Sequence, residues 1–145
     1  MDTANNDQEV ESASVTLVDG LHFAGDIGDV RIDLDAEESV GGVGAGPRPH
    51  RLLLLAMAGC TAMDVLAILR KKRQQVSGLS VEVQGSRADQ HPRVYTRFEV
   101  LYKVRGTNID PQAVARAIEL STTRYCPVIG LLGKVASVAT RYEIE

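Results

Sequence analysis

The sequence has no tryptophan, and only 4% of its 145 residues are aromatic. Proteins that bind single-stranded nucleic acids stack the bases on aromatic side chains, and other nucleic-acid binders usually present a basic face. This chain has few stacking groups, and its formal net charge is −3. The composition therefore argues against a nucleic acid as a partner.

The N-terminus lacks the features of a secretory signal, because the first nine residues contain neither a basic start nor an apolar stretch. We therefore expect a cytoplasmic protein. The only run long enough to span a membrane is residues 52–69, and Asp64 lies in its middle. Because a charge at the centre of a bilayer costs about 3 kcal/mol, we expect a buried core helix here and no membrane partner.

Only two cysteines are present, Cys60 and Cys126. Without a secretory signal, a purely structural disulfide would be unusual, so a cysteine pair favours catalysis or redox sensing. The alternative is that both are simply small buried residues. The cysteines and the three histidines have no ligand spacing such as C-x-x-C or H-x-x-x-H, so we expect no metal site.

A glycine-rich stretch at residues 41–49 precedes the apolar run. It lacks the Gly-Lys-Ser/Thr ending of a phosphate-binding loop and the G-x-G-x-x-G spacing of a dinucleotide site. We interpret it as a flexible lead-in to a helix that Pro49 helps to begin. The sequence thus indicates no bound cofactor.

The hydrophobic pattern predicts an α+β protein with one domain over residues 12–145, after a disordered acidic segment over residues 1–11. In the third predicted strand, alternation places Arg31, Asp33 and Asp35 on the polar face. Helices are expected over residues 51–69 and 110–120 and just after Pro127. The predicted strands are residues 14–18, 21–24, 30–35, 79–84, 94–104 and 136–144.

The first predicted helix is apolar on nearly all sides. A single sheet can cover only one flank of such a helix, and the second predicted helix is short. We therefore predict an obligate homodimer whose interface includes residues 52–69.

Local chemistry assigns different reactivity to the two cysteines, since the thiolate is the reactive form. Cys126 precedes Pro127 at an expected helix cap, where free N–H groups lower a thiol pKa, and Arg124 adds positive charge nearby. Cys60 lies in the middle of its helix, and Asp64 shares its face, where a negative charge would raise the thiol pKa. On these grounds Cys126 is either the reactive thiol or a buried turn residue, whereas Cys60 packs in the core.

Two stretches together resemble the OsmC/Ohr family. They are A-G-C-T-A-M-D-V at residues 58–65, followed by a basic helix end, and Y-C-P-V at residues 125–128. The resemblance extends from about residue 21 to the C-terminus and is greater to the broad OsmC-like branch than to the dedicated organic hydroperoxide resistance enzymes. It implies an intertwined α+β homodimer, with antiparallel sheets wrapped around a long buried central helix and two active sites at the subunit interface.

The resemblance also implies a thiol peroxidase that reduces small hydrophobic organic hydroperoxides in oxidative stress defence. Cys60 would then be the attacking cysteine and Cys126 the resolving one, which reverses the ranking from local chemistry. A cellular dithiol would reduce their disulfide again. Two alternatives stay open, namely a non-catalytic OsmC-like protein that binds a small hydrophobic ligand at the interface, and a redox sensor.

The sequence departs from the peroxidases of the family at two supporting positions. Those enzymes use a glutamate just ahead of the cysteine helix, and its place falls here at His50 or Arg51. They also use an arginine from the N-terminal strands, but Arg31 is the only lysine or arginine before Arg48, and alternation points it away from the apolar face. His50 and Arg51 are candidates for a replacement charge, and a turn of roughly 100° per residue directs Arg51 to the partner subunit's site.

Overall fold

The structure, a computed structural model, describes residues 8–145. The segment expected to be one domain divides into two compact units, Met1–Leu52 and Leu53–Glu145. Of the segment expected to be disordered, residues 1–7 lie outside the described residues. Residues 8–11 are exposed and have no regular secondary structure.

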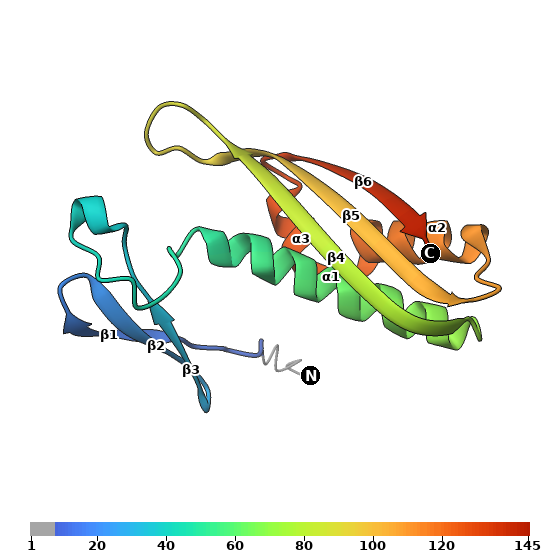
Figure 1. The fold of residues 1–145 in the computed structure, drawn as a ribbon, viewed down its shortest axis with the longest axis horizontal. Helices are drawn as coiled ribbons and strands as arrows, with labels where there is room; N and C mark the ends of the chain where they lie inside the picture. The colour runs from blue at the N-terminus through green and yellow to red at the C-terminus, as the bar shows by residue number, and fades with distance from the viewer. Residues whose placement is uncertain (1–7) are drawn as a thin grey trace, which may run out of the picture. The chain divides into compact units, whose positions relative to one another are not determined.

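The first unit contains the three short strands that the sequence predicts. They are β1 (Ser14–Asp19), β2 (His22–Ile27) and β3 (Val30–Leu34), and they form an antiparallel sheet in the order β1-β2-β3 (Figure 1). Gly20 has a φ of 53° in the turn between β1 and β2, a backbone conformation that suits glycine. A short 3₁₀ turn, η1 (Glu38–Val40), follows the sheet.

Asp35 directly follows β3. The sequence predicted that its side chain faces solvent, but the structure shows that it is buried. It is only 2% exposed. Its carboxylate accepts hydrogen bonds from the backbone N–H groups of Ala36 at 2.7 Å and of Val43 and Ala45 at 3.0 Å each. The strand alternation has ended at this position, and three donors compensate the buried charge. The glycine-rich stretch is therefore anchored on a carboxylate of its own chain and is not the free lead-in that the sequence predicted.

The second unit contains a mixed sheet and three helices. The elements are α1 (Arg51–Lys71, which begins in the first unit), β4 (Gln75–Arg87), β5 (Tyr95–Thr107), α2 (Pro111–Leu120), the π-helical turn η2 (Ser121–Tyr125), α3 (Pro127–Leu132) and β6 (Ser137–Ile144). The strand order is β4-β5-β6. Strands β4 and β5 are antiparallel, whereas β6 runs parallel to β5. This corrects the expected all-antiparallel arrangement, because the helices between β5 and β6 form a crossover.

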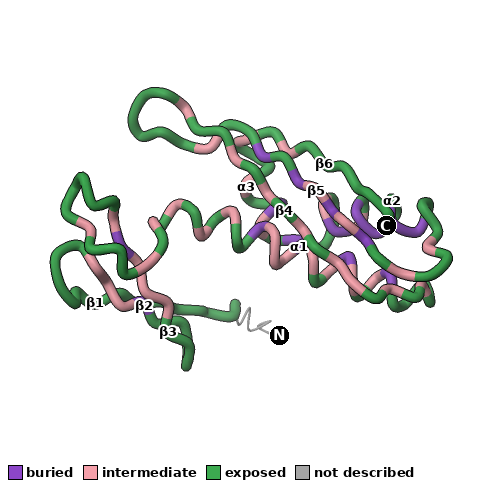
Figure 2. Tube along the Cα trace, in the orientation of Figure 1, coloured by how far each residue is buried: buried purple, intermediate pink, exposed green. Residues whose placement is uncertain are grey.

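The core of the second unit lies between its sheet and its helices, which cover one face of the sheet (Figure 1). Alternate residues of β5 point into this core, as the period of a strand requires. They are Phe98, Val100, Tyr102 and Val104, each at most 1% exposed. Figure 2 shows further buried positions along α2 and α1.

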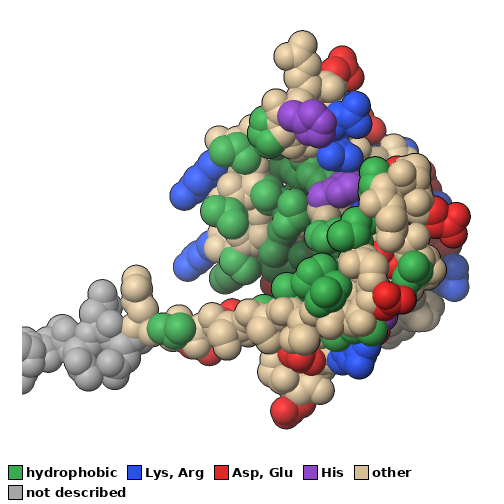
Figure 3. Space-filling model, turned by 90° about the vertical axis from the view of Figure 1, so that its left-hand side faces the viewer, with side chains coloured by type: hydrophobic (Ala, Val, Ile, Leu, Met, Phe, Trp, Pro, Cys, Tyr) green, Lys and Arg blue, Asp and Glu red, His purple; other side chains and the backbone are tan. Residues whose placement is uncertain are grey.

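The long helix α1 confirms that a helix begins at residue 51 and includes the apolar run. Within the single chain, however, only one line of its residues is buried. These are Met57, Thr61, Val65 and Leu69, which repeat at every fourth position. Leu55 and Met63 are 68% and 74% exposed. By length and composition α1 could cross a membrane, and 22% of its most apolar window is buried. Hydrophobic side chains are thus exposed on the surface of the chain (Figure 3).

Candidate functional site

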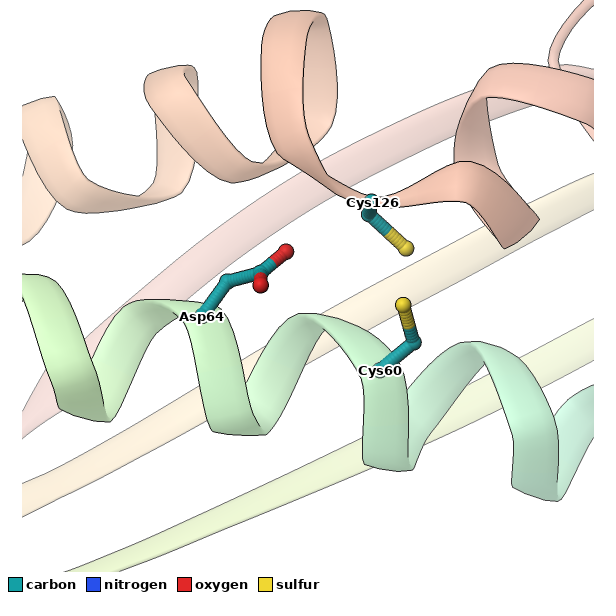
Figure 4. A group of neighbouring side chains, drawn as sticks. All are labelled: Cys60, Asp64 and Cys126. Carbon is teal, nitrogen blue, oxygen red and sulfur yellow. The ribbon is translucent and has the colours of Figure 1, made fainter. Parts of the chain in front are cut away.

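The fold brings the two cysteines together with Asp64. Cys60 and Asp64 lie one turn apart on α1, and Cys126 directly precedes α3 on the facing segment (Figure 4). The two Sγ atoms and a carboxylate oxygen of Asp64 all lie within 4.8 Å of one another. Both cysteines are free thiols. The sequence predicted Cys60 and Asp64 on one helix face, and the family resemblance implied the pairing of Cys60 with Cys126. The structure brings all three residues together.

Cys126 is held in place by the turn that precedes α3. Its backbone N–H donates to the carbonyl of Ser121 at 2.8 Å, and its own backbone is extended, which ends the π-helical turn. Pro127 then begins α3, as its fixed φ favours. The Sγ of Cys126 caps this helix by accepting a hydrogen bond from the N–H of Ile129 at 3.3 Å. The expected helix cap is therefore confirmed.

The chemical consequence expected of that cap is wrong, however. Cys126 is only 4% exposed, and burial raises the pKa of its thiol. A hydrogen bond to Cys60 raises it further, and together these effects outweigh the N–H groups of the cap, so the pKa of Cys126 rises to about 11. The local sequence could not show this, because Cys60 and the apolar surroundings come from other elements. Cys126 is therefore a protonated thiol near neutral pH.

A chain of hydroxyl groups leads from the core of the second unit to Asp64. The Ser121 hydroxyl donates to Oδ2 of Asp64 at 2.9 Å. Because Ser121 has one hydroxyl hydrogen, the Thr61 hydroxyl must donate to Ser121 at 2.8 Å, and the Tyr102 hydroxyl in turn must donate to Thr61 at 2.7 Å. All three hydroxyl-bearing residues are fully buried. The carboxylate thus fixes the direction of every hydrogen bond in the chain.

Sequence reasoning missed these three hydroxyl groups. Thr61 and Ser121 lie beside residues that the motifs singled out, but a buried hydroxyl has no characteristic spacing. The available signal was Asp64 itself, because a carboxylate in an apolar helix needs hydrogen-bond donors from elsewhere in the fold.

The predicted supporting cations lie at exposed or half-buried positions. Arg124 is exposed, and its guanidinium carbon lies 5.4 Å from the ring centroid of Tyr125. Arg51 is exposed at the start of α1, and His50 is half-buried just before it. Arg31 lies on the polar side of its strand, as alternation predicted, where it forms an ion pair with Asp33 at 2.8 Å.

The second unit also has a cavity of about 510 Å³ beside η2, α3 and β6. Neither cysteine lines it. The residues that do line it include Thr122, Thr123, Ile129, Lys134 and Val138. Because the N–H of Ile129 donates to the sulfur of Cys126, this cavity adjoins the thiol site without being lined by either thiol.

Comparison with known proteins now places the chain in a family. Residues 41–141 match the sequence model of a protein family that is described as OsmC-like protein. The chain belongs to the OsmC-like protein family. Protein YhfA of Escherichia coli K12, a relative of this OsmC-like chain, is 34% identical to it over 133 residues, which is 91% of this chain and 96% of YhfA.

Solved structures show the same OsmC-like fold. A hypothetical protein from Aquifex aeolicus superposes with a TM-score of 0.84 at 28% identity, covering 95% of this chain and 98% of that one. An organic hydroperoxide resistance protein OsmC from Legionella pneumophila superposes with a TM-score of 0.65 at 14% identity, covering 94% and 97% of the two chains. At that identity the second likeness concerns the fold alone.

Proposed function

We propose that this OsmC-like protein is a cysteine-based peroxidase that reduces organic hydroperoxides through a Cys60–Cys126 thiol/disulfide cycle. The observation that carries the proposal is the approach of the two free thiols to within 4.8 Å, although they come from different elements. A disulfide bond needs its sulfurs about 2.05 Å apart, so the two side chains must still move closer before the bond can form.

The burial of the two thiols favours one division of roles. Cys60 is half-buried and thus the more exposed of the two residues, whereas Cys126 is 4% exposed. The raised pKa of Cys126 also keeps that thiol protonated while Cys60 is reduced. Cys60 is therefore assigned as the attacking thiol and Cys126 as the resolving thiol.

The proposed cycle has three steps. The Cys60 thiolate attacks the O–O bond of ROOH, which yields a Cys60 sulfenic acid and ROH after proton uptake. The Cys126 sulfur then attacks the sulfenic sulfur, and the disulfide forms as the oxygen leaves as water. A cellular dithiol finally exchanges with the disulfide, restores both thiols and is itself oxidised.

The apolar surface of α1 supports a proposal for the substrate and the assembly. Leu53, Leu55 and Met63 of this helix are 41%, 68% and 74% exposed, and a hydrophobic hydroperoxide would partition to such surroundings. We propose that a second copy of the chain covers this face in an obligate homodimer, since the same patch can meet itself across a two-fold axis.

The division of roles is testable with two serine variants. Chelator-treated protein is mixed with cumene hydroperoxide, tert-butyl hydroperoxide or hydrogen peroxide, and its mass and free thiols are followed. Cys126→Ser should accumulate a Cys60 sulfenic acid that dimedone traps, and Cys60→Ser should leave Cys126 unoxidised. Oxidation of both variants at the rate of free cysteine would instead favour a non-catalytic binding protein. Fast disulfide formation without catalytic turnover would favour a redox sensor.

A further inference from the structure

Cys60, Asp64 and Cys126 also form a set of metal-ligand groups. Thiolate sulfur and carboxylate oxygen are both ligands of Zn²⁺, and here one atom from each residue lies within 4.8 Å of the other two. Figure 4 shows the three side chains directed into the space between α1 and the start of α3. Spacing rules could not predict this set, because Cys126 comes from a separate element.

The dimensions of the cluster are close to those of a tetrahedral zinc site. Zinc binds thiolates at about 2.3 Å and carboxylates at roughly 2.0–2.2 Å, which separates the ligand atoms by roughly 3.5–3.8 Å. The three atoms here need only a small contraction from at most 4.8 Å, and each is the end of a rotatable side chain.

The carboxylate already has an outer shell of the kind that metal ligands use. The Ser121 hydroxyl holds Oδ2 of Asp64 at 2.9 Å, and the Thr61 and Tyr102 hydroxyls extend the hydrogen-bond chain into the core. Such outer-shell hydrogen bonds orient ligating carboxylates. No ion pair among the described residues includes Asp64, so its carboxylate has the Ser121 hydroxyl as a described donor but no described counter-ion.

The site is also accessible. Cys60 and Asp64 are both half-buried, so an ion can reach the cluster from solvent. Three protein ligands leave one tetrahedral position for water.

We propose that the reduced protein binds one Zn²⁺ per chain through Cys60, Cys126 and Asp64. On binding, two S–H bonds are replaced by two Zn–S bonds, and the thiol protons pass to solvent. A Cys60–Cys126 disulfide removes both sulfur ligands, so oxidation releases the ion. The inference goes beyond the proposed function, because binding requires the thiols but no reaction with peroxide.

Metal titration of the full chain tests this proposal. Reduced, chelator-stripped protein is titrated with zinc chloride against a chromophoric chelator, and with cadmium chloride while the thiolate-to-cadmium absorption is recorded. We expect one ion per chain, release of protons on binding, and no binding after oxidation to the disulfide. Failure of the reduced wild-type protein to bind stoichiometrically would overturn the proposal.

Substitutions at the three ligands and at Ser121, with Asp89→Asn as the control, test the composition of the site. Cys60→Ser and Cys126→Ser should each abolish zinc binding, and Ser121→Ala should weaken it by about 10- to 100-fold through the loss of an outer-shell bond. Asp64→Asn should weaken it more, whereas Asp89→Asn, at an exposed position, should leave it unchanged. Equal affinities of wild type and Asp64→Asn would contradict a three-ligand site. Circular dichroism checks the fold of each variant, and the oxidised wild type tests the sulfur ligands without any substitution.

The zinc proposal and the peroxidase proposal fail separately. Zinc binding together with slow peroxide reduction would support the zinc proposal and contradict the peroxidase proposal. Fast peroxide reduction by a protein that does not bind zinc would do the reverse.

Discussion

The hydroxyl of Ser121 donates a hydrogen bond to the carboxylate of Asp64, and that carboxylate lies within 4.8 Å of both cysteine sulfurs. The buried core of the second unit is thereby connected to its two thiols. The relationship joins the stability of the unit to its chemistry.

Ser121→Ala removes the central member of the hydroxyl chain. Thr61 then loses its acceptor and Asp64 loses its donor, so we expect the free energy of unfolding to fall by about 1–3 kcal/mol. Urea denaturation measures this loss. The control is Thr123→Ala, which removes an exposed hydroxyl that bonds a helix carbonyl at 2.6 Å and should change stability much less. Equal effects of the two substitutions would contradict the role of the buried chain.

Cys60→Ala changes the ionisation of Cys126. Burial is the largest cause of its raised pKa, and the hydrogen bond and the charge of Cys60 add to it. We expect the pKa of Cys126 to fall below about 11 in the variant but to stay above that of a free thiol. Alkylation of Cys126 by iodoacetamide, followed against pH by mass spectrometry, reports this pKa. A pKa unchanged by the substitution would mean that the two thiols do not interact.

Asp35→Asn tests the anchor of the glycine-rich stretch. The backbone N–H groups of Ala45 and Val43 lower the pKa of Asp35 below its ordinary value, so its stabilising effect is present above about pH 4 and is lost as the pH falls through the lowered pKa. The wild type should therefore lose stability in acid more steeply than Asp35→Asn, which is already weaker at neutral pH.

The control for this experiment is Asp29→Asn, at an exposed position of the turn between β2 and β3. Unfolding is followed against pH for all three proteins, together with hydrogen exchange of the Val43 and Ala45 amides. Exchange that stays as slow in Asp35→Asn as in the wild type would contradict the anchor.

Leu55→Glu and Met63→Glu test the proposed homodimer. Both side chains are largely exposed on α1, so a charge there leaves the single chain folded but would be buried without a partner charge in a dimer. We expect sedimentation to show a dimer for the wild type and monomers for the variants. Val135→Glu, at an 80% exposed position outside the helix, should remain dimeric. A wild-type monomer would contradict the dimer, and flotation of that monomer with lipid vesicles would assign the face to a membrane.

Much of the fold was predictable, because alternation and helix-start signals are local. The start of the second helix at Asp110–Pro111 and the three N-terminal strands follow directly from such signals. Strand β4 was predicted too short, since Gly78 and Gly85 near its ends interrupt the alternation. The parallel direction of β6 was not predictable from its own residues, because it depends on the crossover.

The site was predictable in its members but not in its arrangement. The two cysteines and Asp64 are evident in the sequence, and their spacing on α1 places Cys60 beside Asp64. The pairing with Cys126, the pKa of that thiol and the hydroxyl chain all arise from contacts between α1, β5 and the η2–α3 segment. Local sequence therefore favoured Cys126 as the reactive thiol, although the fold raises the pKa of that thiol.

The rate of disulfide formation distinguishes a peroxidase from a protein whose thiols are incidental. Reduced wild-type protein is mixed with one equivalent of cumene hydroperoxide in the presence of a chelator, and intact mass is recorded over time. We expect each chain to lose two hydrogens as the Cys60–Cys126 disulfide forms, faster than with hydrogen peroxide and much faster than free cysteine is oxidised. Oxidation at the rate of free cysteine, or a product without this disulfide, would contradict the peroxidase proposal.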